Sequence, residues 1–281
     1  MATRLISRLP EQHQLSAYRS LHRWRRRAHR AAAPLRRQRA TQTAQVTPTS
    51  VVDALTSSEQ ATIDRCRPYS LASAERLVAT MDAVEYVVRG GVEGALVECG
   101  VWKGGSVLAM ILTLQRLGVD DRDVYLFDTF SGMTEPSGHD TSRFDEPAAG
   151  TWASARSAGT KAWDWLFRPD VFGKDQVESL LRETGYPASR IHFVAGPVED
   201  TLPESAPPEV AVLRLDTDWY ESTRQELVHL YPRLREGGVL LIDDYGHWDG
   251  ARRAVDEYFT SCAAPVLLGR TDYTGRMAVK R

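Results

Sequence analysis

Residues 210–216 read Val-Ala-Val-Leu-Arg-Leu-Asp, and residues 239–244 read Val-Leu-Leu-Ile-Asp-Asp. Each is a nearly unbroken run of aliphatic residues that ends in an acidic residue. Similar apolar runs occur earlier in the chain, at residues 96–100, 124–128 and 191–194. Runs of this length that do not alternate with polar residues are typical of strands buried on both faces of a parallel sheet.

Helical patterns separate or follow these runs, at residues 105–117, 175–184, 222–234 and 250–262. Pro232 is expected to interrupt the third of them. Residues 265–268 and 276–279 flank a Thr-Asp-Tyr-Thr-Gly turn and predict a closing hairpin. Strands that alternate with helices and end in a hairpin predict an α/β fold, with a doubly wound, mostly parallel, Rossmann-like sheet and an antiparallel edge.

The composition narrows the class of protein. The chain has 281 residues, of which 42% are hydrophobic, enough for a sizeable core. No apolar run reaches the roughly 18 residues of a membrane span, so we do not expect an integral membrane protein. The three cysteines, Cys66, Cys99 and Cys262, form no C-x-x-C pair. An odd number of separated cysteines fits a reducing cytoplasm better than a disulfide framework or a zinc site.

The net charge of −2 hides two unequal parts. Residues 1–40 contain eleven arginines and one acidic residue, whereas the remainder has 24 basic and 36 acidic residues. We therefore expect a basic, mobile arm and linker over residues 1–50 and an acidic domain over residues 51–281. Residues 133–173 form a long connection rich in tryptophan, and a connection of that length predicts a lid over an acceptor, with an insertion packed on the core as the alternative. We do not expect the arm to bind nucleic acid.

Carboxylates gather where the predicted strands end. Because the carboxyl ends of parallel strands line the ligand crevice of an open α/β sheet, Asp216, Asp243 and Asp244 are expected to converge there. Clustered carboxylates repel one another unless a positive charge lies among them. An all-oxygen set of ligands suits Mg²⁺, Mn²⁺ or Ca²⁺ rather than zinc, and we expect magnesium.

A glycine-rich turn follows the first predicted strand. Residues 98–106 read Glu-Cys-Gly-Val-Trp-Lys-Gly-Gly-Ser. Glycines allow close approach of a ligand to the backbone, and the following helix offers free N–H donors at its start. The spacing is neither that of G-x-G-x-x-G nor that of a phosphate loop. Asp128, about 30 residues further on, ends the second strand, where an acidic residue accepts hydrogen bonds from ribose, and Ser131 follows it as a further candidate for the cofactor site.

The glycine turn, Asp128 and the block at residues 215–258 resemble the macrocin-type O-methyltransferases, which tailor antibiotic sugars. These class I enzymes depend on S-adenosylmethionine and a metal, and the resemblance covers residues 50–281. The turn is also similar to the E-x-G-x-x-x-G-x-S motif of catechol O-methyltransferase, matched here by Glu98, Gly100, Gly104 and Ser106.

The resemblance implies a role for each of these residues. Glu98, Gly100 and Ser106 would hold the methionine end of the cofactor, and Asp128 would hold the ribose. Glu199 and Asp200 would lie near the adenine, although Gly196-Pro197-Val198 before them departs from the family pattern. The three aspartates at the strand ends would ligate the cation.

The sequence therefore predicts methyl transfer from S-adenosylmethionine to a hydroxyl of a sugar or glycosylated natural product. A cation that lowers the pKa of the acceptor hydroxyl would assist a base, for which Asp216 is the first candidate and His247 the second. We expect a homo-oligomer. The alternatives are a nicotinamide-dependent oxidoreductase and a non-catalytic nucleoside-binding module recruited by the basic arm. The sequence does not identify the acceptor.

Overall fold

The computed structural model describes residues 55–168, 172–262 and 265–281. The basic arm predicted for residues 1–50 lies outside them. A seven-stranded sheet has the order β3-β2-β1-β4-β5-β7-β6. Its strands are β1 (Ala95–Cys99), β2 (Val124–Asp128), β3 (Ile191–Ala195), β4 (Val210–Leu215), β5 (Leu234–Ile242), β6 (Gly269–Arg270) and β7 (Arg276–Val279). The strands β1 to β5 are parallel, and β7 runs antiparallel to both β5 and β6.

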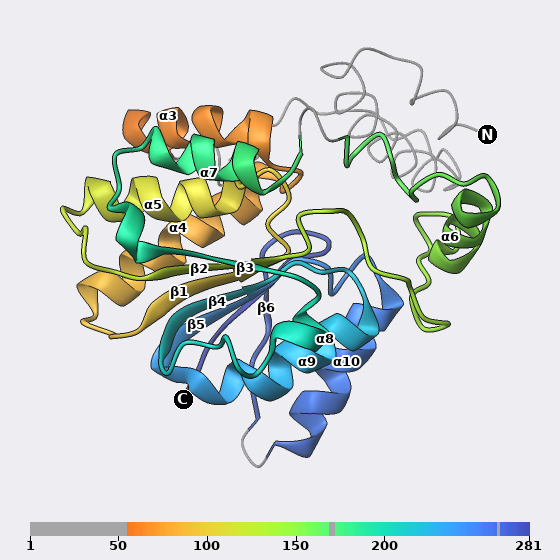
Figure 1. The fold of residues 1–281 in the computed structure, drawn as a ribbon. Coiled ribbons are helices and arrows are strands. Elements are labelled where there is room, and N and C mark those ends of the chain that lie inside the picture. Colours follow the sequence, from red (N-terminus) through yellow and green to blue (C-terminus); the bar gives the residue numbers. More distant parts are fainter. Residues whose placement is uncertain (1–54, 169–171, 263–264) are drawn as a thin grey trace, which may run out of the picture. The chain divides into compact units, whose positions relative to one another are not determined.

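Helices cover both faces of the sheet (Figure 1). One layer consists of α3 (Ser57–Cys66), α4 (Ala74–Arg89), α5 (Gly105–Arg116) and α7 (Lys174–Arg182). The other consists of α8 (Val198–Thr201), α9 (Tyr220–His229) and α10 (Asp249–Ser261). A separate helix, α6 (Ala148–Ser157), stands apart from both layers. The predicted doubly wound sheet with an antiparallel edge is confirmed.

Local signals explain where the first helices begin. At α3, the Thr56 side chain accepts a hydrogen bond from the Glu59 amide, and the Glu59 carboxylate accepts one from the Thr56 amide. This capping box satisfies two amides that a helix start otherwise leaves without partners. Ser73 caps α4 in the same way through the Arg76 amide. The sequence analysis assigned no helix to this region.

Two apolar clusters hold the layers to the sheet. Strand residues alternate between them, so that Leu96, Val212 and Leu241 pack toward α4 and α5, whereas Val97 and Leu213 pack toward α8, α9 and α10. The residues of β1 and β4 are all buried. Along the described parts of the chain, no helix has the length and hydropathy needed to cross a membrane.

Two element boundaries differ from the prediction. The strand β5 begins at Leu234 rather than Val239, because Pro232 lies in a single 3₁₀ turn that ends the helical stretch early. The hairpin pairs Gly269 and Arg270 with β7, not residues 265–268. Pro265 has no amide hydrogen for a ladder, and the turn closes at Thr271, whose amide donates to the Gly275 carbonyl.

Candidate active site

Three carboxylates meet at the carboxyl ends of β4 and β5. Asp216, Asp243 and Asp244 each place an oxygen within 4.8 Å of the others. Their backbones are held in register, because the Asp216 amide donates to the Cys99 carbonyl and the Asp243 amide donates to the Leu215 carbonyl, both at 2.9 Å. The structure therefore brings together the three residues that the sequence analysis selected. We call these three residues and the nearby Asp218 the acidic rim.

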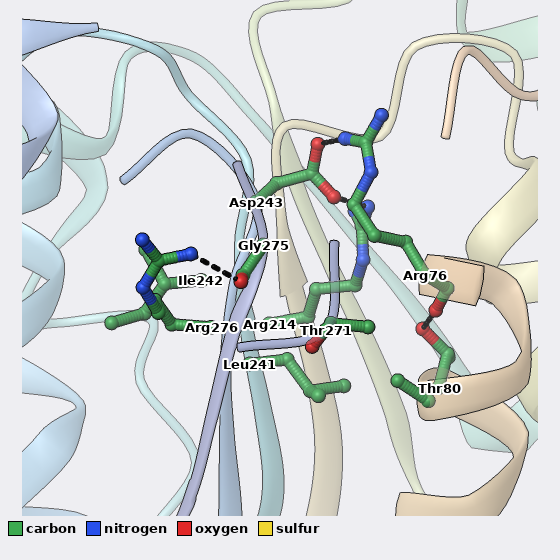
Figure 2. Close-up of a pocket in the computed structure, with 10 residues that line it drawn as sticks. Arg76, Thr80, Arg214, Leu241, Ile242, Asp243, Thr271, Gly275 and Arg276 are labelled. Atoms are coloured by element: carbon green, nitrogen blue, oxygen red, sulfur yellow. Dashed lines mark hydrogen bonds and ion pairs between the residues drawn. The ribbon is translucent and has the colours of Figure 1, made fainter. Parts of the chain in front are cut away.

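A buried guanidinium lies directly below the acidic rim. The side chain of Arg214, on β4, is 2% exposed. Its Nη1 donates to Glu98 Oε1 at 2.5 Å and to Asp216 Oδ2 at 2.6 Å, and its Nη2 donates to Asp243. Arg76, from the first turn of α4, also contacts Asp243 (Figure 2). Arg214 thus fixes the relative positions of carboxylates from three strands.

The two arginines do not balance the carboxylates around them. Five carboxyl groups, those of Glu98 and the acidic rim, face two guanidinium groups. Burial raises the pKa of Glu98 to about 8, raises that of Asp218 to about 7 and raises that of Asp244 well above its usual value. Burial thus favours the protonated form of these carboxyl groups, and a further cation would favour the charged form. An excess of oxygen donors at one point fits a hard divalent cation.

Asp218 lies in a strained turn beside this cluster. Its φ of +69° is in the left-handed region, which residues other than glycine seldom adopt. The Trp248 Nε1 donates to Asp218 Oδ1 at 2.8 Å, and the Asp218 amide donates to Asp244 Oδ2 at 3.3 Å. The sequence analysis did not include Asp218 among the expected ligands. The structure adds it to the groups that face the strand ends.

The glycine turn passes very close to the acidic rim. Gly100 has a φ of +82°, and a Cβ there would lie 2.0 Å from the Asp216 carbonyl oxygen, so no larger residue fits. Gly104, with a φ of +84°, precedes α5, whose start has no side-chain cap. Ser106 is buried in its first turn. Amide groups at such a start attract an anionic group such as a carboxylate.

Asp128 and Glu98 flank this turn. Asp128 accepts hydrogen bonds from the amides of Val101 and Trp102, at 2.7 and 3.0 Å, and from that of Phe130 at 2.6 Å. Its carboxylate therefore fastens the turn to β2 and keeps one acceptor position for a ligand. The Oε2 of Glu98 is buried and has no hydrogen-bond partner among the described residues.

The predicted adenine residues behave differently from one another. The Oε2 of Glu199, on α8, is buried without a partner in the described part of the chain, and burial raises the pKa of Glu199. Asp200 and Ser131 are exposed, and within the described ranges neither side chain contacts the other residues of the site. Of these three residues, Glu199 is the one with a buried acceptor oxygen that has no hydrogen-bond donor among the described residues.

Comparison with known proteins supplies the family. The profile of the macrocin O-methyltransferases (TylF) matches residues 14–277, which is most of the chain. The chain belongs to the macrocin O-methyltransferase family. It is 34% identical over 190 residues to the 8-demethyl-8-(2,3-dimethoxy-alpha-L-rhamnosyl)-tetracenomycin-C 4'-O-methyltransferase of Streptomyces olivaceus, covering 68% of this chain and 67% of that protein. It is 32% identical over 193 residues to the demethyldecarbamoylnovobiocin O-methyltransferase of Streptomyces niveus, with coverage of 68% and 67%.

A solved structure agrees with this assignment. The O-methyltransferase NovP matches with a TM-score of 0.63 and 30% identity, over 75% of this chain and 82% of that chain. The resemblance stated from the sequence is confirmed, and the chain is an O-methyltransferase. The oxidoreductase and the non-catalytic module are set aside.

In this methyltransferase, His247 is a tether. Its Nδ1 lies 2.9 Å from the Tyr273 hydroxyl and its Nε2 lies 2.8 Å from Asp145 Oδ2, while the Phe144 ring stacks on the imidazole with centroids 5.5 Å apart. Both ring nitrogens are thus engaged. His247 joins the long connection at residues 133–173 to the hairpin turn, and its role as a base stays a prediction.

The same connection is anchored at three further points. The Trp219 Nε1 donates to the Thr134 carbonyl at 3.1 Å, and the Trp102 Nε1 donates to the Leu166 carbonyl at 3.0 Å. The buried Asp140 accepts from the Tyr220 amide, at the start of α9. The connection is therefore fastened to the glycine turn and to the β4–α9 turn, which both border the site.

The sequence analysis missed Glu226. This residue, on α9, is 0% exposed, and its Oε1 accepts a hydrogen bond from Thr217 Oγ1 at 2.8 Å. Thr217 lies between two members of the acidic rim, so Glu226 supports the backbone that carries them. Its Oε2 has no partner among the described residues, and burial raises its pKa well above the usual value. Helical spacing was the available signal, because Glu226 shares the buried face of α9 with Ser222, Thr223 and Leu227.

Proposed function

We propose that this enzyme transfers the methyl group of S-adenosylmethionine to a hydroxyl of a sugar or glycosylated natural product, with a divalent cation, most readily Mg²⁺, held by Asp216, Asp243 and Asp244. The observation that carries the proposal is the convergence of these three carboxylates beside the glycine turn. The names of the tetracenomycin and novobiocin relatives support the class of acceptor.

The cofactor would lie across the carboxyl ends of β1, β2 and β3. The unpartnered Glu98 Oε2 would accept a hydrogen bond from the amino group of the methionine end, and the uncapped start of α5, with Gly104 and Ser106, would receive its carboxylate. The remaining acceptor position of Asp128 would take a ribose hydroxyl. The unpartnered oxygen of Glu199 would accept from the adenine amino group, with Asp200 and Ser131 at the border.

The chemistry needs an activated acceptor. A bound divalent cation supplies Lewis acidity that lowers the pKa of a sugar hydroxyl and fixes its direction. The thioether that leaves the sulfonium needs no proton, so the one proton to be moved is that of the acceptor. Asp216 is our proposed base, because its side chain is the most open of the three at 28% exposed and Arg214 engages only its Oδ2. Asp218 and His247 are the second candidates.

Two measurements test the proposal. Calorimetry with S-adenosylhomocysteine should show binding, and its absence would remove the cofactor assignment. For the cation, Mn²⁺ binding followed by electron paramagnetic resonance should be lost in Asp243→Asn, and turnover should fall by more than about 100-fold. Asp175→Asn, on the exposed start of α7, is the matched control. Unchanged turnover after metal chelation, or equal Mn²⁺ binding by both variants, would remove the cation from the mechanism.

We also expect the enzyme to be cytoplasmic and to self-associate. Cys66, Cys99 and Cys262 are all unpaired, and the first two are buried. Unpaired thiols fit a reducing compartment. Self-association stays a prediction, which sedimentation of the full chain would decide.

A further inference from the structure

An arginine cluster lies on the opposite side of the β5–β7 edge from the acidic rim's own arginines. Arg276 begins β7, and its backbone pairs with that of Ile242, the residue before Asp243. Figure 2 shows the Arg276 side chain on one side of the strand and the side chains of Arg76 and Arg214 on the other. Arg270 pairs with Arg276 across the hairpin, so these two like charges face the same side.

Two arginine side chains lie over the ring of Tyr245. The guanidinium carbon of Arg276 lies 4.7 Å from the Tyr245 centroid and that of Arg252, from α10, lies 5.5 Å from it. The Arg252 Nε also donates to the Tyr245 carbonyl at 3.2 Å. Tyr245 directly follows Asp244 in the chain. The arginine cluster, which we define as Arg252, Arg270 and Arg276, therefore adjoins the acidic rim.

None of these three arginines forms an ion pair with a carboxylate among the described residues. The nearby carboxyl groups are used elsewhere, because Asp256 accepts from the Tyr245 hydroxyl at 2.7 Å and Asp272 pairs with Arg76 at 3.3 Å. Such an imbalance is unusual in a domain whose remaining charge is acidic. Three positive charges thus lie close together, and the nearest carboxylate named here, that of Asp256, is bonded to the Tyr245 hydroxyl rather than to an arginine.

Arg276 is the decisive member of the cluster. It is 8% exposed, and its Nη1 donates to the carbonyls of Thr274 and Gly275, at 3.2 and 2.8 Å. Its Nε and Nη2 have no hydrogen-bond partner among the described residues. A buried charge without a carboxylate partner is costly, and burial together with Arg270 and Arg252 lowers its pKa. An anionic ligand would remove that cost.

The backbone around Arg276 is rigid. The Gly246 amide donates to the Thr274 carbonyl at 2.9 Å, and Thr274 Oγ1 donates to the Asp243 carbonyl at 2.7 Å. A Cβ on Gly246 would lie 2.0 Å from the Tyr273 carbonyl oxygen, so the two turns are in close contact. Arg276 is thus held in a turn that is fastened to Asp243, a member of the acidic rim.

We propose that the arginine cluster binds the phosphoryl groups of a nucleotide-activated sugar, so that this enzyme methylates the sugar before its transfer to an aglycone. The assignment rests on the proposed function, since it places the reacting hydroxyl at the acidic rim. Guanidinium groups match phosphate oxygens with paired hydrogen bonds. A hexose that spans the two sites presents a ring hydroxyl to the carboxylates and its anomeric diphosphate to the arginines.

The test is calorimetry of the full chain in the presence of S-adenosylhomocysteine, with uridine diphosphate and inorganic pyrophosphate as probes. Uridine diphosphate should bind, and Arg252→Gln and Arg270→Gln should each weaken it by about tenfold. Arg253→Gln is the matched control, because Arg253 lies next to Arg252 on α10 and pairs with Glu257. Both glutamine variants alter exposed or half-buried side chains and should fold normally. The arginines of residues 1–40 also attract phosphate, but they do so equally in every variant.

Turnover gives a second measurement. For a nucleotide-activated hexose that the enzyme methylates, kcat/KM should fall about tenfold in Arg270→Gln, while that for the methyl glycoside of the same hexose should not change. No binding of uridine diphosphate, or equal binding by all variants, would overturn the proposal. Binding of pyrophosphate with methylation of glycosides alone would overturn the assignment to an acceptor. Loss of S-adenosylhomocysteine binding would instead contradict the proposed function.

Discussion

Two neighbouring regions of this methyltransferase carry opposite imbalances of charge. In the acidic rim and Glu98, five carboxyl groups face two guanidinium groups, and burial raises the pKa of Glu98 and Asp218. In the arginine cluster, three guanidinium groups have no carboxylate partner among the described residues, and two of them lie over the Tyr245 ring. The peptide bond between Asp244 and Tyr245 joins the two regions. Folded domains seldom leave charge unmatched in this way unless a ligand completes it, so the contrast supports the cation and the phosphoryl groups that we propose for the two regions.

The largest effect should come from breaking the acidic rim at its base. Arg214→Met leaves the carboxylates of Glu98, Asp216 and Asp243 without their shared partner, and we expect a loss of about 3–5 kcal/mol in the free energy of unfolding. Urea denaturation measures it. Arg235→Met, at an exposed pair with Glu209, is the control and should cost under about 1 kcal/mol. A loss no greater than that of the control would show that Arg214 does not balance the rim. If a cation completes the rim, Mg²⁺ should restore part of the stability of Arg214→Met.

The second effect comes from separating the rim from the glycine turn. Gly100→Ala places a methyl group against the Asp216 carbonyl and puts alanine at a positive φ, for an expected loss of about 2–4 kcal/mol. Thermal unfolding measures the loss, and calorimetry should show weaker S-adenosylhomocysteine binding. Gly118→Ala also has a positive φ but an open surrounding, so it isolates the cost of φ alone. Equal losses in the two variants would contradict the close approach.

The third effect is a pH dependence of stability that comes from the buried Glu226 carboxyl group on α9. Burial raises the pKa of Glu226, so the folded protein keeps a proton that the unfolded chain releases above a pH of about 4. This stabilising contribution is complete at low pH and is lost as the pH rises. Glu226→Gln keeps an acceptor for Thr217 without the titration, and should gain about 1 kcal/mol or more relative to the wild type between pH 5 and pH 8. Differential scanning calorimetry of the metal-free protein checks it, with the exposed Glu221→Gln as control. Parallel pH profiles for wild type and Glu226→Gln would refute a buried proton.

The smallest expected effect is a change in the stability of the arginine cluster. Arg270→Gln removes a like charge opposite Arg276, so without ligand the protein should become more stable by a few tenths of a kcal/mol, about 0.5 at low salt. Thermal unfolding at low and high ionic strength measures the gain and its screening. A loss of stability at low salt would mean that the cluster is balanced by a partner, and the contrast between the two regions would disappear.

The order of strands and helices and the convergence of Asp216, Asp243 and Asp244 could be predicted from the sequence. Buried parallel strands are long apolar runs, and their ends are marked by the first charged residue, so strand and rim follow from the same pattern. The edge hairpin was placed four residues too early, because β6 is only two residues long and its apolar neighbour Leu267 is exposed. Such short pairings are set by the closing turn rather than by hydropathy.

Features that depend on contacts distant in sequence could not be predicted. Arg214 lies inside an apolar strand, and only the positions of Glu98 and Asp243 on neighbouring strands explain its burial. The arginine cluster combines residues from α10, β6 and β7, and no spacing in the chain links them. The tether at His247 depends in the same way on Asp145, about a hundred residues away.

Asp140 fixes one end of the long connection at residues 133–173. Its carboxylate accepts from the Tyr220 amide, and a Cβ at Gly250 would lie 1.9 Å from Asp140 Oδ1, so this point is locked to α9 and α10. The other fixed point is the Leu166 carbonyl, which accepts from Trp102. Between these two points the chain includes α6 and Asp145, which His247 also holds. An exchange of this segment for that of a relative must therefore keep the contact with His247 if the neighbouring hairpin turn is to stay in place.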